Sequence, residues 1–109
     1  HAQALAPQID ASGFRFLHVL GPCPPGWRYP TSGSAEVARL AVESRTFPLV
    51  AYDEGRWRIT LRPRHPVPVR DFLAVQGRFS HLDDAAIAAI QAHVDERWAA
   101  FEALERGAA

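Results

Sequence analysis

Apolar and polar positions form their clearest pattern in the last quarter of the chain. Apolar side chains recur there at spacings of three, four, four and three residues, at Ile87, Ile90, Val94, Trp98 and Phe101. This spacing predicts one long α-helix with a single apolar face. Asp83 or Asp84 is suited to cap its amino terminus, and we expect the helix to end near Gly107.

Two shorter patterns lie in the middle of the chain. The first is helical and follows possible caps at residues 32–34, with one face formed by Val37, Leu40, Ala41 and Ser44. The second begins after Pro48 and predicts a strand at Leu49 to Tyr52, a turn at Asp53-Glu54-Gly55 and a strand at Arg56 to Arg62. The second strand alternates, with one face formed by Trp57, Ile59 and Leu61. A half-exposed β-hairpin is therefore expected.

The remaining segments show no such periodicity. Phe14 to Leu20 is an almost continuous apolar run, which predicts a strand buried on both faces of a parallel sheet. Before it, residues 1–12 are expected to form the end of a helix or a connector, and Gly13 a break. Arg62 to Arg70 contains three prolines and predicts an extended arm, which leads into a short turn at Asp71 to Val75.

Together these elements predict an α/β fold of one domain, or of a piece of one. Twelve basic and twelve acidic residues give a formal net charge of zero, so we expect no general electrostatic binding to nucleic acid or to an anionic membrane. No apolar run approaches the roughly 20 residues that a membrane span needs. The single cysteine fits a reducing compartment, and we expect a cytoplasmic protein.

That single cysteine, Cys23, lies in the stretch GPCPPGW, directly after the predicted buried strand. A residue before proline is driven towards extended geometry, so Pro24 and Pro25 should make the loop stiff and fix the direction of the thiol. The loop also leaves the carboxyl end of a strand, where open α/β sheets bind ligands. Residue types alone leave two interpretations open: a ligand or reactive thiol, or a small buried apolar side chain.

The histidines and tryptophans add no catalytic constellation. His18, within the apolar run, is expected to be buried or half-buried, and no histidine has the spacing of a metal or nucleophile motif. Trp57 and Trp98 lie on apolar faces and are expected to pack. For Trp27, two roles are open: it shields whatever Cys23 contacts, or it packs in the core. The acidic pairs fit a turn, a helix start and a solvated helix face.

Three blocks occur in order along the chain: GPCPPGWRY, VARLAVESRTFPLVAYDEGRWRIT and VPVRDFLAVQGRFSHLDDAAIAAIQAHVDERW. Together they resemble the carboxyl-terminal third of the β subunit of 2-oxoacid:ferredoxin oxidoreductases, the family of pyruvate synthase. The resemblance extends from about Phe14 to Trp98. It implies the carboxyl-terminal part of a thiamine-diphosphate-binding fold, so residues 1–109 would be a single partial domain of a larger β subunit.

The family resemblance also implies an activity and its cofactors. Such enzymes have several subunits, use thiamine pyrophosphate, coenzyme A and [4Fe-4S] clusters, and decarboxylate a 2-oxoacid oxidatively to an acyl-CoA. They pass the electrons to ferredoxin, and for this chain ferredoxin or another electron acceptor is the expected partner. Pyruvate is the default substrate, with branched-chain or aryl 2-oxoacids as alternatives. By the match to the family's loop, Cys23 would be the cofactor-binding, metal-ligating residue of a shared [4Fe-4S] cluster. No catalytic residue is expected in this chain.

The chain also departs from the family pattern. A GDG-type thiamine pyrophosphate motif with its downstream Asn is absent, as are the family's three other cluster cysteines, and Pro25 replaces a Thr common in relatives. We therefore expect neither cofactor to be bound by this chain alone, and expect other subunits or an amino-terminal part of the β subunit to complete the site. The competing interpretation is a non-catalytic assembly or interaction module.

Two further expectations follow from the resemblance. Pro22, Pro24 and Pro25 have no N–H groups and would donate no backbone hydrogen bonds to cluster sulfur, which favours a low reduction potential. The arm at Pro63 to Val69 and the last helix, through Trp98 and Phe101, would contact neighbouring subunits, with core packing as the alternative for both side chains.

Overall fold

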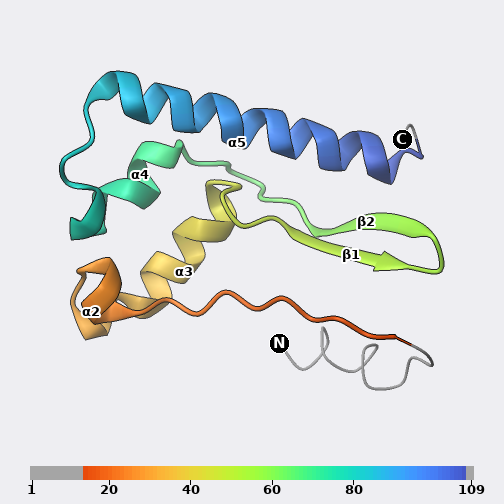
Figure 1. Cartoon of the computed structure of the whole chain (residues 1–109), viewed down its shortest axis with the longest axis horizontal. Helices are drawn as coiled ribbons and strands as arrows, with labels where there is room; N and C mark the ends of the chain where they lie inside the picture. Colours follow the sequence, from red (N-terminus) through yellow and green to blue (C-terminus); the bar gives the residue numbers. More distant parts are fainter. Residues whose placement is uncertain (1–13, 108–109) are drawn as a thin grey trace.

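The computed structural model describes residues 14–107 and contains short helices, one β-hairpin and a long carboxyl-terminal helix (Figure 1). In chain order, the elements are α2 (Pro24–Trp27), η1 (Thr31–Gly33), α3 (Ser34–Glu43), β1 (Leu49–Asp53), β2 (Arg56–Leu61), α4 (Val69–Ala74), η2 (Gly77–Phe79) and α5 (Asp84–Glu105). The expected mixture of helices and strands is thus confirmed. The predictions for residues 1–12 and for Gly13 fall outside the described residues.

The main core lies where α3, α4 and α5 meet. The predicted apolar face of α3 is buried, and it is joined by α4 and by the side chain that follows α2; the cluster consists of Tyr29, Val37, Leu40, Ala41, Val69, Phe72, Leu73 and Val94. Burying one large aliphatic or aromatic side chain contributes about 1.5–3 kcal/mol, so a cluster of this size is enough to fix how the three helices pack.

Helix α5 matches its prediction closely. Asp83 caps it, with the carboxylate accepting a hydrogen bond from the Ala86 N–H at 2.8 Å. Val94 and Trp98 are buried, and the Arg45 guanidinium lies 4.8 Å from the centre of the Trp98 ring. Of the two roles expected for Trp98, subunit contact and core packing, the structure supports core packing.

The hairpin also forms where the sequence predicts it. Glu54 and Gly55 both have positive φ, 52° and 78°, which is the backbone of a type I′ turn. Leu61 was expected to share the buried face of β2, and this is wrong, because it is 48% exposed. The pairing explains the error: Leu49 pairs with Leu61 but Val50 with Ile59, so a bulge interrupts the alternation before Leu61.

The hairpin lies beside the end of α5 (Figure 1), and polar contacts tie the two together. The Ile59 N–H donates to a Glu105 carboxylate oxygen at 2.7 Å. Arg62 forms ion pairs with the same carboxylate and with Glu102. These bonds satisfy an amide in the middle of β2 and fix the angle between hairpin and helix.

Two predictions on the unperiodic segments are wrong. Residues 14–20 are extended but form no strand, and their side chains are mostly exposed, with Phe14 at 92% and Phe16 at 71%. Among the described residues the sheet contains only β1 and β2, so this run has no neighbouring strand to bond or cover it. In Figure 1 it passes as an extended ribbon from the N-terminal side towards α2.

The second error concerns the arm and the turn that follows it. The arm ends at Pro68, earlier than expected, and Val69–Ala74 forms the helix α4 in place of a turn. Pro68 stands at the N-cap with φ −65° and ψ 150°, where the missing N–H of proline costs nothing. Burial of Val69, Phe72 and Leu73 supplies the packing that stabilises so short a helix.

Candidate functional site

Cys23 stands immediately before the single helical turn α2. Its backbone is extended, with φ −123° and ψ 103°, as the following proline predicts. Pro24 and Pro25 occupy the first helical positions, and the Cys23 carbonyl accepts a hydrogen bond from the Trp27 N–H at 2.9 Å. The backbone of the predicted stiff loop is therefore closed by a bond between Cys23 and its last residue, Trp27.

The thiol of Cys23 is exposed, which excludes the buried apolar interpretation within this chain. Gly26 lies close to the thiol, since an added Cβ there would lie 3.7 Å from Sγ. Among residues 14–107 no group of three or more His, Cys, Asp or Glu side chains is placed to hold a metal ion. Within the part of the chain that the structure describes, no other side chains are therefore grouped to share a metal ion with the Cys23 thiol.

The backbone reverses direction directly after α2. The Pro24 carbonyl accepts hydrogen bonds from Arg28 N and Tyr29 N, at 2.9 and 3.2 Å, and Arg28 is left-handed with φ 60°. The Arg28 carbonyl then accepts a hydrogen bond from the Gly77 N–H at 2.8 Å. A Cβ at Gly77 would lie only 2.8 Å from Arg28 Cβ, so the two backbones can meet here only because residue 77 is glycine.

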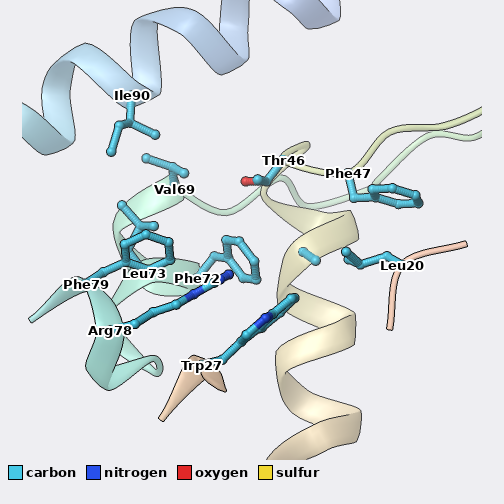
Figure 2. A pocket seen from close by; sticks show the side chains of 11 residues that line it. Leu20, Trp27, Thr46, Phe47, Val69, Phe72, Leu73, Arg78, Phe79 and Ile90 are labelled. Atoms are coloured by element: carbon cyan, nitrogen blue, oxygen red, sulfur yellow. The ribbon is translucent and has the colours of Figure 1, made fainter. Parts of the chain in front are cut away.

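Side chains reinforce this contact. The Arg78 guanidinium lies 4.1 Å from the centre of the Trp27 ring and 4.6 Å from that of Phe79. Its Nε donates to the Gln76 side-chain oxygen at 2.9 Å, and Gln76, which is only 1% exposed, donates in turn to the Phe72 carbonyl. Burial lowers the pKa of Arg78 from its usual value. Figure 2 shows the Arg78 side chain extended alongside the Trp27 ring.

Trp27 forms one wall of an open apolar groove with a volume of about 270 Å³ (Figure 2). Leu20 and Phe47 lie at one end of the groove, and Phe72 meets the Trp27 ring edge to face at a centroid distance of 6.4 Å. Of the two roles open for Trp27, packing against the core is the one that these contacts support. The cysteine loop is therefore anchored through Trp27.

The other residues considered from the sequence lie apart from the thiol loop. His18 is exposed, contrary to the expectation, because the run around it has no covering strand; its ring meets Phe47 edge to face at 5.4 Å. His65, His81 and His93 are exposed as well. The acidic pairs occupy the hairpin turn, the start of α5 and its exposed face, as predicted.

The sequence interpretation missed Gln76, Gly77 and Arg78 as residues of the site. They lie in the third block that carries the family resemblance, and this was the only signal that could have drawn attention to them. Their contacts with Trp27 and Arg28 join segments far apart along the chain, which local periodicity cannot reveal.

Similar proteins were found by comparison with curated sequences, whereas no protein-family model matches the chain. Pyruvate synthase subunit PorB of Methanocaldococcus jannaschii is 43% identical over 89 residues, which cover 82% of this chain and 30% of that protein. Ketoisovalerate oxidoreductase subunit VorB of Pyrococcus furiosus is 42% identical over 89 residues, covering 80% and 29%. PorB of Thermotoga maritima is 37% identical over 102 residues, covering 89% and 32%. The chain thus spans about a third of the length of these relatives.

Proposed function

We propose that this chain, a homologue of the β subunits of 2-oxoacid:ferredoxin oxidoreductases, forms the part of such a subunit that supplies one cysteine ligand to an iron–sulfur cluster. The relatives' names confirm the resemblance first seen in the three sequence blocks. The complete enzyme would decarboxylate a 2-oxoacid oxidatively, transfer the acyl group to coenzyme A and pass the electrons to ferredoxin. Pyruvate is the default substrate, and a branched-chain 2-oxoacid is the alternative.

The observation that carries this proposal is the presentation of Cys23. Its thiol is exposed on a loop whose backbone is closed by hydrogen bonds and anchored to the core through Trp27. A thiolate that ligates a metal must be reachable and must lose little freedom on binding, because every degree of freedom lost weakens the bond. An exposed thiol on a stiff loop meets both conditions.

A [4Fe-4S] cluster needs four protein thiolates, and the donor set of this chain fits one of them. Cys23 is the only cysteine in the sequence, and residues 14–107 contain no group of three or more His, Cys, Asp or Glu side chains placed to hold a metal ion. When bound, the cluster would accept and release single electrons. The role of this chain is to supply one cysteine ligand to the cluster. The remaining cysteines and the thiamine pyrophosphate site come from other subunits or from the rest of the β subunit.

The same loop favours a low cluster potential. Pro24 and Pro25 fill the first positions of α2, and Trp27 N is already bonded to the Cys23 carbonyl. Few backbone N–H groups therefore remain to donate to cluster sulfur, and fewer such bonds mean a lower potential. Replacing Pro24 with Ala restores one N–H, and the cluster potential is expected to rise in a redox titration of the variant.

The partners of the chain are other subunits or the rest of the β subunit. The exposed apolar run at residues 14–20 supports this, because large apolar side chains in a row are usually covered in the assembled protein. We propose that this run becomes a strand of the thiamine-diphosphate-binding fold when the remaining strands are present. No helix among the described residues 14–107 is long and apolar enough to cross a membrane.

The same apolar run also supports a second function, that of a non-catalytic assembly module in which Cys23 is idle. Co-purification with the companion subunits, with and without this chain, separates the two functions. The proposed function predicts that only the full set converts 2-oxoacid and coenzyme A to acyl-CoA with reduction of ferredoxin. Full turnover by the set that lacks this chain would reject the catalytic role and leave the assembly module.

A further inference from the structure

The helical turn that presents Cys23 cannot be stable by itself. It spans only Pro24–Trp27, and even much longer isolated helices are marginal in water. Among its side chains, only the ring of Trp27 is large enough to anchor the turn, and this ring packs against the core cluster. The direction of the Cys23 thiol therefore depends on what holds that ring.

Arg78 is placed to hold it. Its guanidinium lies 4.1 Å from the centre of the Trp27 ring, where a planar cation is attracted by the π system. Arg78 is itself fixed from behind, because its Nε donates to the side chain of Gln76, a buried residue bonded to the backbone of α4. The ring is thus clamped between the apolar core and a cation that has little freedom to move.

The clamp is coupled to the cysteine through the backbone. Trp27 N bonds to the Cys23 carbonyl at 2.9 Å, so a displacement of the Trp27 backbone is passed on to the residue that bears the thiol. Next to Arg78, Gly77 donates a hydrogen bond to the carbonyl of Arg28, the residue directly after the turn. Residues 77 and 78 of η2 therefore hold the carboxyl end of the turn, at Trp27 and Arg28.

We propose that Arg78 is a positioning residue for the Cys23 thiol: by stacking on Trp27 it sets the direction in which α2 presents the thiol to its metal cofactor. The identity of that cofactor rests on the proposed function, whereas the clamp itself does not. A planar guanidinium is required for the stack and the Gln76 bond together, so lysine is an incomplete substitute.

The test uses the assembled enzyme with Arg78→Ala and Arg78→Lys, and with Arg70→Ala as the matched control, since Arg70 forms an exposed ion pair on the neighbouring α4. Hydrogen exchange is measured at the amides of Trp27, Arg28 and Tyr29. We expect about tenfold faster exchange in Arg78→Ala, a smaller increase in Arg78→Lys, and less than about a twofold change in the control. If Arg78→Ala does not fold, the increase in Arg78→Lys carries the test.

A second readout separates positioning from general stability. We expect the electron paramagnetic resonance signal and midpoint potential of the reduced cluster to shift in Arg78→Lys, with iron content and melting temperature unchanged. Exchange within about twofold of the parent in both variants would overturn the proposal, and so would an unshifted signal in an enzyme whose cluster is lost in Cys23→Ser. Cys23→Ser reports on the proposed function alone: if it keeps the cluster while Arg78→Ala still frees the loop, the cofactor assignment fails and the clamp stands.

Discussion

Replacing Gly77 with Ala should displace the cysteine loop by steric contact alone. The new Cβ would lie 2.8 Å from Arg28 Cβ, closer than real Cβ atoms approach, and 3.1 Å from the Arg28 carbonyl oxygen, which is also a tight contact. Arg28 can yield little, because its left-handed backbone is fixed by its own bond to the Pro24 carbonyl. The two segments must therefore separate, and the hydrogen bond between them lengthens.

The size of the effect follows from these contacts. Overpacking of this kind costs about 1–3 kcal/mol, and weakening the bond from Gly77 N–H to Arg28 adds about 0.5–1.5 kcal/mol. Replacing glycine also reduces the conformational freedom of the unfolded chain, which stabilises the folded protein by about 0.4–1 kcal/mol. We expect a net loss of about 2 kcal/mol in the free energy of unfolding.

Urea denaturation followed by tryptophan fluorescence measures this loss. Gly21→Ala is the matched control, because the same methyl group at Gly21 meets no atom within 4 Å. The control is expected to stay within about 0.5 kcal/mol of the parent. A Gly77→Ala protein as stable as the Gly21→Ala protein would refute the close approach and the account of how the loop is anchored.

Three other substitutions test the remaining contacts. Asp83→Ala removes the cap of α5 and should cost about 1 kcal/mol by urea denaturation; no measurable loss would mean that the cap is not formed. Glu105→Ala leaves the Ile59 amide without its acceptor and should cost about 1–2 kcal/mol, with faster exchange of that amide, which an unchanged rate would contradict. Arg39, hydrogen-bonded to Glu36, holds the pKa of that carboxyl below its usual value, so Arg39→Ala should raise it in an NMR titration. Because the pKa of Glu36 is depressed in the folded state, the pair stabilises above the ordinary carboxyl pKa, and this small gain disappears as pH falls through the folded value.

The elements whose structure depends only on neighbouring residues were predicted correctly from the sequence. Helix α5 has both a repeating apolar face and a capping Asp83, and the hairpin has a turn with glycine in the place that needs positive φ. The extended backbone of Cys23 followed from Pro24 alone. These features need no information from distant residues, which is why the sequence sufficed.

The wrong predictions concern segments whose structure depends on residues far away along the chain. The run at residues 14–20 has the composition of a buried strand, but a strand requires neighbours that residues 14–107 do not supply. Helix α4 contains too few residues for periodicity to mark it, and its apolar side chains are buried by packing on the other helices. The contact between Arg78 and Trp27 crosses half of the chain, so only the structure could reveal it.

The central claim is that Cys23 ligates a cluster, and counting iron and acid-labile sulfide in the purified complex tests it most directly. Cys23→Ala and Cys23→Ser are compared with Pro25→Ala, which changes the same loop and keeps the thiol. The account predicts that both cysteine variants lose about four iron and four sulfide per β subunit, the content of one cluster, while Pro25→Ala keeps them. Cysteine variants with the full iron and sulfide content would contradict it.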